Sequence, residues 1–121
     1  MTNDRIDAFI RAQVLDSKVT PSKGQPPQAR CLRIERIALV SVARHLGLRR
    51  GDLVVSIDGK PAGSFDPKLY RDPVDRRPYT FWSPWREERI DATISGAPIG
   101  AELRKTVAAM WNALAKAERN G

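Results

Sequence analysis

Residues 41–59 constrain the fold more than any other part of this 121-residue chain. Ser41 is a residue type that caps helix N-termini, and it precedes a short run, residues 42–46, that suits one turn of helix. Gly47 then predicts an abrupt end, because glycine adopts the left-handed conformation without strain. Leu48 follows directly, so we expect its side chain to enter the core.

The second half of this stretch predicts a turn, a buried strand and another turn. Gly51 and Asp52 can reverse the backbone while the aspartate oxygens accept hydrogen bonds from amides exposed at the turn. A β-branched run over residues 53–57 then predicts a strand. Asp58 and Gly59 close it with the dipeptide that most strongly signals a tight turn.

As a whole, the stretch resembles the centre of a PDZ domain. Bacterial members commonly read Ser-Pro-Ala, two variable residues, Ala-Gly-Leu, two variable residues, Gly-Asp, then an apolar strand ending in Asn-Gly or Asp-Gly. This chain agrees except that Val42 replaces the proline and Leu46 the alanine. The resemblance extends more loosely over residues 31–103. It implies structural rather than binding roles for the motif residues Gly47, Leu48, Gly51, Asp52 and Gly59.

The remaining pattern predicts an α+β fold. We expect a small twisted antiparallel sheet, partly closed into a barrel and covered by short helices, with further helices at both chain ends. Besides residues 53–57, the strands are predicted at residues 31–38, 79–82, 89–94 and 99–103, and a short helix at 66–71. The expected organisation is an N-terminal helix over 1–15, a loop or linker over 16–29, a PDZ-like domain over 30–104 and a C-terminal amphipathic helix over 105–121.

Each terminal helix carries an apolar stripe at helical spacing, and we expect each to dock by it. The N-terminal stripe consists of Ile6, Phe9, Ile10 and Val14. The C-terminal stripe consists of Val107, Met110, Trp111 and Leu114. Residues 16–28 hold three prolines and no periodicity, which predicts a linker or a long surface loop.

Peptide binding is the function that the PDZ resemblance implies, with a loop of backbone amides holding a C-terminal carboxylate ahead of a strand edge. Upstream of the motif only Gly24 is present, and it is flanked by polar residues. The better candidate is residues 95–103, downstream of the predicted hairpin, which would be a circularly permuted arrangement. Pro98 removes one amide from that loop. The expected peptide-binding residues are Gly96, Ile99, Gly100, Ala101, Leu103, Leu69 and Tyr70. The alternative is that this segment is only a turn and an edge strand.

Catalysis has few candidate residues in this chain. One cysteine excludes a disulfide framework or a Cys-based zinc site, and one histidine excludes the commonest zinc arrangements. Cys31 and His45 are the only pair suited to nucleophilic catalysis, which also needs hydrogen-bond contact and an orienting group. We therefore expect a non-enzyme without a metal or a cofactor.

The positive net charge indicates another candidate function, nucleic-acid binding. The chain has 21 Lys and Arg against 14 Asp and Glu, a net charge of +7 that lies mainly in residues 30–63. We expect the arginines of strand 31–38 to point to solvent at alternate positions. With Trp82 and Trp85 as stacking platforms the chain would be a nucleic-acid-binding domain, but these clusters lie far apart in sequence. Only weak, sequence-independent binding to nucleic acid is then expected.

No apolar run exceeds five residues, far below the length needed to cross a bilayer, and acids near the N-terminus are unlike a signal peptide. We therefore expect a cytoplasmic chain with no membrane span.

The leading hypothesis is a protein- or peptide-binding module that acts by strand addition. The alternative is a regulatory or substrate-presenting domain of a larger bacterial enzyme, such as a protease, so the chain would belong to a larger polypeptide or assembly.

Overall fold

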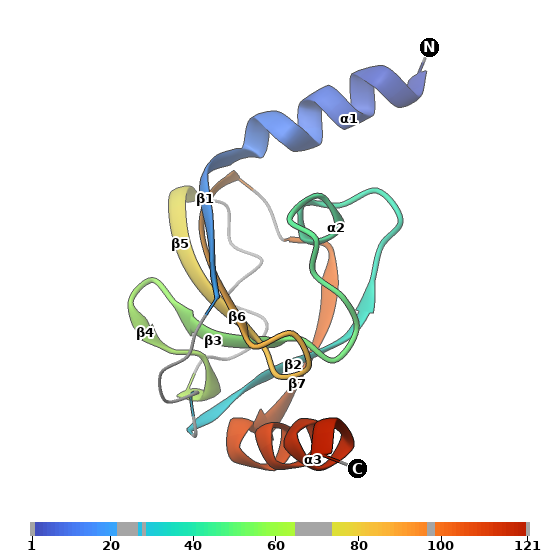
Figure 1. The fold of residues 1–121 in the computed structure, drawn as a ribbon. Helices are drawn as coiled ribbons and strands as arrows, with labels where there is room; N and C mark the ends of the chain where they lie inside the picture. The colour runs from blue at the N-terminus through green and yellow to red at the C-terminus, as the bar shows by residue number, and fades with distance from the viewer. Residues whose placement is uncertain (1, 22–26, 28, 65–73, 97–98, 121) are drawn as a thin grey trace.

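The computed structural model describes residues 2–21, 27, 29–64, 74–96 and 99–120. Within them the chain is an α+β fold with one seven-stranded antiparallel sheet that does not close, and three α-helices (Figure 1). The elements in chain order are α1 (Thr2–Gln13), β1 (Val14–Pro21), β2 (Arg30–Ile37), α2 (Val42–His45), β3 (Leu53–Ile57), β4 (Lys60–Pro61), the 3₁₀ turn η1 (Ala62–Ser64), β5 (Val74–Ser83), β6 (Glu88–Gly96), β7 (Ala101–Val107) and α3 (Ala108–Asn120).

The strands lie in the order β1-β6-β5-β3-β2-β7, and the short β4 pairs with β3 outside this path. Strands β1 and β7 are therefore the two edges of the sheet. Strands β5 and β6 form a long hairpin, while β7 returns to pair with β2 from the opposite end of the chain. None of the helices in the described ranges is long and apolar enough to span a membrane.

The predicted helix–turn–strand unit forms as its residue types require. The Ser41 hydroxyl accepts a hydrogen bond from the Arg44 N–H at 3.1 Å and so caps α2. Gly47 ends the helix with a φ of +80°. Asp58 and Gly59, at φ +56° and +76°, form the tight turn after β3.

The core lies where the central strands bury their β-branched and aromatic residues. Leu53, Val54 and Ile57 of β3 are fully buried, and Val54 stands opposite Phe81 of β5. Leu48 is buried as predicted. The motif therefore supplies both a turn and the centre of the core.

The loop predicted over residues 16–28 is wrong in its first part. Residues 14–21 are strand β1, which pairs with β6 from Val14 opposite Ile94 to Pro21 opposite Glu88. As an edge strand it is exposed over most of its length, so its sequence lacks the apolar alternation that marks a half-buried strand. Residues 22–26 and 28, and the helix predicted at 66–71, lie outside the described residues.

Other boundaries move by a few residues. The strand predicted at 79–82 extends over Val74–Ser83, and the one predicted at 99–103 runs instead over Ala101–Val107. Gly100 has a φ of +79°, which turns the chain and leaves Ile99 outside the strand. The C-terminal helix begins at Ala108.

The docking faces predicted for the terminal helices are largely wrong. On α1 only Ile10 packs against the core, followed by Val14 at the start of β1, while Ile6 and Phe9 are exposed. On the C-terminal side Val107, Met110 and Leu114 are exposed, whereas the small residues Ala108 and Ala115 are fully buried. Trp111 alone of that predicted stripe is partly buried.

Candidate functional site

Strand β7 is the edge at which the sequence predicts peptide binding. It pairs with β2 along one side from Ala101 to Val107, and no other described strand lies along its second side (Figure 1). An edge strand presents a row of backbone donors and acceptors that a further strand can satisfy.

The pairing pattern identifies which backbone groups of β7 face outward. Ile34 of β2 donates its N–H to the Asp52 carbonyl and accepts from the Gly51 N–H, both at 2.9 Å, so its backbone groups point away from β7. Ile34 stands opposite Leu103, which makes this a pair without mutual hydrogen bonds. Backbone groups alternate along a strand, so the N–H and C=O groups of Leu103 and Lys105 point to the open side.

Over residues 101–104 the side chains of β7 alternate between the core and the surface. Ala101 is buried and Leu103 is half-buried against the main core, while Glu102, Arg104 and Lys105 are exposed. Glu102 lies 3.4 Å from the guanidinium of Arg36 on the neighbouring strand. The first half of the strand, residues 101–104, therefore has an apolar inner face and a charged outer face.

The turn before β7 is fixed by the segment around α2. The Ile99 carbonyl accepts a hydrogen bond from the Ala43 N–H, and the Gly100 carbonyl accepts one from the Ala38 N–H, both at 2.9 Å. A Cβ at Gly100 would lie 2.5 Å from the Ser41 Cβ. Packing against Ser41, together with the positive φ, is therefore what requires a glycine at this position.

This geometry changes the expected roles of several predicted site residues. Ile99 is fully buried, so its side chain cannot line a surface groove as expected. Gly96 ends β6 with its backbone opposite Val74. Leu69 and Tyr70 of the predicted groove, and residues 97–98 of the predicted carboxylate loop, lie outside the described residues.

Asp52 of the motif accepts hydrogen bonds from two parts of the chain. Its carboxylate accepts hydrogen bonds from the Arg49 N–H at 2.9 Å and from the Arg86 guanidinium at 2.7 Å. Burial raises the pKa of the Asp52 carboxyl, although these donors act in the opposite direction. The amide cap was predicted from the sequence, but the link to Arg86, 34 residues away in the β5–β6 turn, had no local signal.

Cys31 and His45 lie in different parts of the molecule. Cys31 is buried in β2 with Leu53, Trp82 and Ala108, and burial raises the pKa of its thiol to about 11. His45 is exposed at the end of α2. Since the thiolate is the nucleophilic form, this raised pKa leaves little of the reactive form at neutral pH.

The two candidate stacking tryptophans both contact α3. Trp82 is buried and donates its indole N–H to the Asn112 side chain at 2.8 Å, while the Trp85 indole N–H donates to Glu118.

The expectation that the β2 arginines point to solvent is wrong for Arg33. Its guanidinium lies 4.2 Å from the Trp111 ring centre and bonds to Glu35 at 2.7 Å.

No protein-family model matches the chain, and no curated protein matches its sequence.

Proposed function

We propose that this chain is a PDZ-like protein- or peptide-binding module that takes an extended segment of a partner as a further strand along β7. The chain would be a circularly permuted version of that architecture with an open sheet, and the ligand edge would lie downstream of the motif. The observation that carries the proposal is the open side of β7, where the backbone groups of Leu103 and Lys105 meet no described strand.

The backbone and the side chains contribute differently to recognition at such an edge. Main-chain hydrogen bonds supply affinity without regard to sequence, and alternate side chains of the ligand supply specificity. Because Pro98 has no N–H, the loop before β7 is poorly equipped to hold a carboxylate. Internal segments of a partner should therefore bind about as well as free C-termini.

The test is a proline in place of Lys105. Proline removes an outward N–H but keeps the hydrogen bonds to β2, and prolines are tolerated on edge strands at such positions. Peptides selected from a random library on the unmodified protein should bind Lys105→Pro about tenfold more weakly or not at all, because a ladder hydrogen bond is lost and the ring obstructs the ligand backbone.

Lys105→Ala is the control, because it removes the same charge and retains the N–H. It should bind the selected peptides nearly as well as the unmodified protein. In hydrogen exchange, the amides of Leu103 and Lys105 should become protected when peptide is added. Equal binding by Lys105→Pro and Lys105→Ala, with no added protection at these amides, would place the peptide site elsewhere. Gly100 is unsuited to such a test because a side chain there collides with Ser41.

A further inference from the structure

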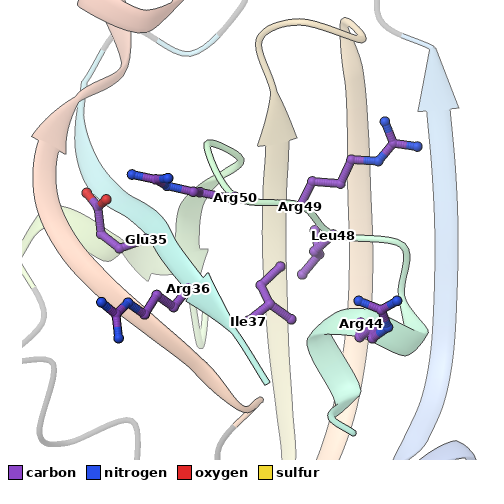
Figure 2. Close-up of a pocket in the computed structure, with 7 residues that line it drawn as sticks. All are labelled: Glu35, Arg36, Ile37, Arg44, Leu48, Arg49 and Arg50. Atoms are coloured by element: carbon purple, nitrogen blue, oxygen red, sulfur yellow. The ribbon is translucent and has the colours of Figure 1, made fainter. Parts of the chain in front are cut away.

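A hollow of about 700 Å³ lies between the end of β2 and the segment that runs from α2 to β3 (Figure 2). This volume is within the range of known ligand sites. We call it the arginine groove, and its lining residues are Glu35, Arg36, Ile37, Arg44, Leu48, Arg49 and Arg50.

The groove forms where β2 and the segment before β3 stop pairing and diverge. Pairing on this side of β2 ends at Ile34, which exchanges backbone hydrogen bonds with Gly51 and Asp52. Beyond that point residues 35–37 continue along β7, while residues 44–50 lie on the far wall (Figure 2). No described strand covers residues 35–37 on the groove side.

The floor of the groove is apolar and its walls are strongly basic. Leu48 is buried and Ile37 half-buried, and both contribute to the main core. The exposed side chains of Arg44, Arg49 and Arg50 form no ion pair with any described residue.

The other two charged residues of the groove are already paired. Arg36 is next to Glu102, and Glu35 is bonded to Arg33. Three guanidinium groups thus remain available to an anionic ligand.

We propose that the arginine groove binds an extended acidic segment of a protein partner. Its carboxylates would pair with Arg44, Arg49 and Arg50, since the planar guanidinium matches a carboxylate with two parallel hydrogen bonds. An aliphatic side chain of the same segment would cover Ile37 and Leu48. This site is separate from the β7 edge and does not depend on strand addition there.

Two observations favour an acidic peptide over nucleic acid. None of the described residues that line the groove is aromatic, so these residues offer bases no ring on which to stack. The apolar floor also suits an aliphatic side chain, which a phosphodiester backbone does not supply.

The experiment measures fluorescence anisotropy with a labelled peptide of sequence Asp-Glu-Leu-Glu-Asp-Glu at low ionic strength. The double variant Arg49→Glu with Arg50→Glu should bind this peptide about tenfold more weakly or worse, because two attractive pairs become repulsive ones. Both side chains are exposed, so the thermal melt should be unchanged. Arg44→Glu, on α2, should weaken binding in the same direction.

The control is Arg5→Glu with Lys116→Glu, which changes the net charge equally at exposed positions on α1 and α3. It should retain nearly full affinity, and so should Lys105→Pro. A peptide with serine in place of leucine should bind more weakly to the unmodified protein.

Three outcomes would overturn the proposal. Equal losses in the two double variants would mean that only net charge matters. An unchanged affinity of the serine peptide would remove the role of the apolar floor. A labelled 12-mer of deoxythymidine that binds more tightly than the peptide, and is released by Arg49→Glu with Arg50→Glu, would identify the groove as a nucleic-acid site.

Discussion

The two terminal helices have similar lengths and similar amphipathic sequences, yet they meet the rest of the molecule very differently. Helix α1 projects away from one end of the sheet, whereas α3 lies against the other end (Figure 1). Phe9 on α1 is 67% exposed, while Ala108 and Ala115 on α3 are fully buried. An apolar stripe of helical period therefore does not show by itself whether a helix docks, or by which face.

Specific side-chain hydrogen bonds hold α3 against the rest of the molecule. The Asn112 side chain accepts the Trp82 indole N–H at 2.8 Å and donates to the Pro27 carbonyl at 2.6 Å. Arg119, at the end of the helix, donates to the Pro84 carbonyl at 2.7 Å. On α1 the polar side-chain contact found among the described residues is an exposed pair between Arg11 and Asp7 of the same helix, and exposed pairs of this kind contribute little.

Small residues select the docking face of α3. Ala108 and Ala115 are fully buried, and Ala108 packs with Cys31, Leu53 and Trp82, whereas the larger apolar residues Met110 and Leu114 remain at the surface. A hydrophobicity pattern gives the large residues most weight, so it selects the wrong face. Close packing here depends on shape, which the linear sequence does not display.

The largest effect that separates the two helices is expected from Ala115→Glu. A longer, charged side chain would have to enter a fully buried position, which should lower the free energy of unfolding by about 2 to 3 kcal/mol. Urea denaturation measures this loss. Ala113→Glu, at an exposed position of the same helix, should change stability by less than about 0.5 kcal/mol. Equal effects of the two substitutions would mean that α3 does not dock by this face in solution.

The fold was predictable from sequence where local chemistry decides the backbone. Ser41, Gly47 and the Asp58-Gly59 turn act on their immediate neighbours, so the helix cap, the helix end and the turn follow from residue type. Strand β1 was missed because its pairing with β6 joins residues some 70 positions apart and leaves no apolar alternation.

The candidate site was predictable only in part. The sequence indicates an edge strand over residues 99–103, but the role of Gly100 comes from its contact with Ser41, 59 positions earlier. The arginine groove likewise needs Arg36 from β2 and Arg49 from the turn before β3, which only the fold brings to one hollow. Long-range packing, rather than any local preference, places these residues together.

A smaller effect is expected at alkaline pH from Cys31, which is buried in the cluster that α3 covers. Burial raises the pKa of the Cys31 thiol from 9.0 to about 11, so between these values the unfolded chain loses a proton that the folded chain keeps. Its contribution to stability is therefore present below pH 9 and is lost as the pH rises towards 11. From pH 8 to pH 10 the loss should be about 1 kcal/mol.

The comparison that isolates this effect is the pH slope of Cys31→Ala, which shares every other titrating group. Its free energy of unfolding should fall less steeply above pH 9 than that of the unmodified protein, as measured by urea denaturation at several pH values. Identical slopes would mean that the thiol is hydrated, and hence that α3 does not stay closed over Cys31.

The smallest effect is expected on α1, from Phe9→Ser. Because this side chain is 67% exposed, its removal should change the free energy of unfolding by no more than about 0.5 kcal/mol. Ile10→Ser, on the neighbouring face that packs against the core, should cost at least about 1 kcal/mol in the same thermal or urea measurement. A loss from Phe9→Ser as large as that from Ile10→Ser would show that the exposed stripe of α1 is covered in solution. Light scattering on both forms would then tell whether a second copy of the chain covers it, because the measured mass would fall with the substitution. An unchanged mass together with an unchanged stability is the result that the contrast between α1 and α3 requires.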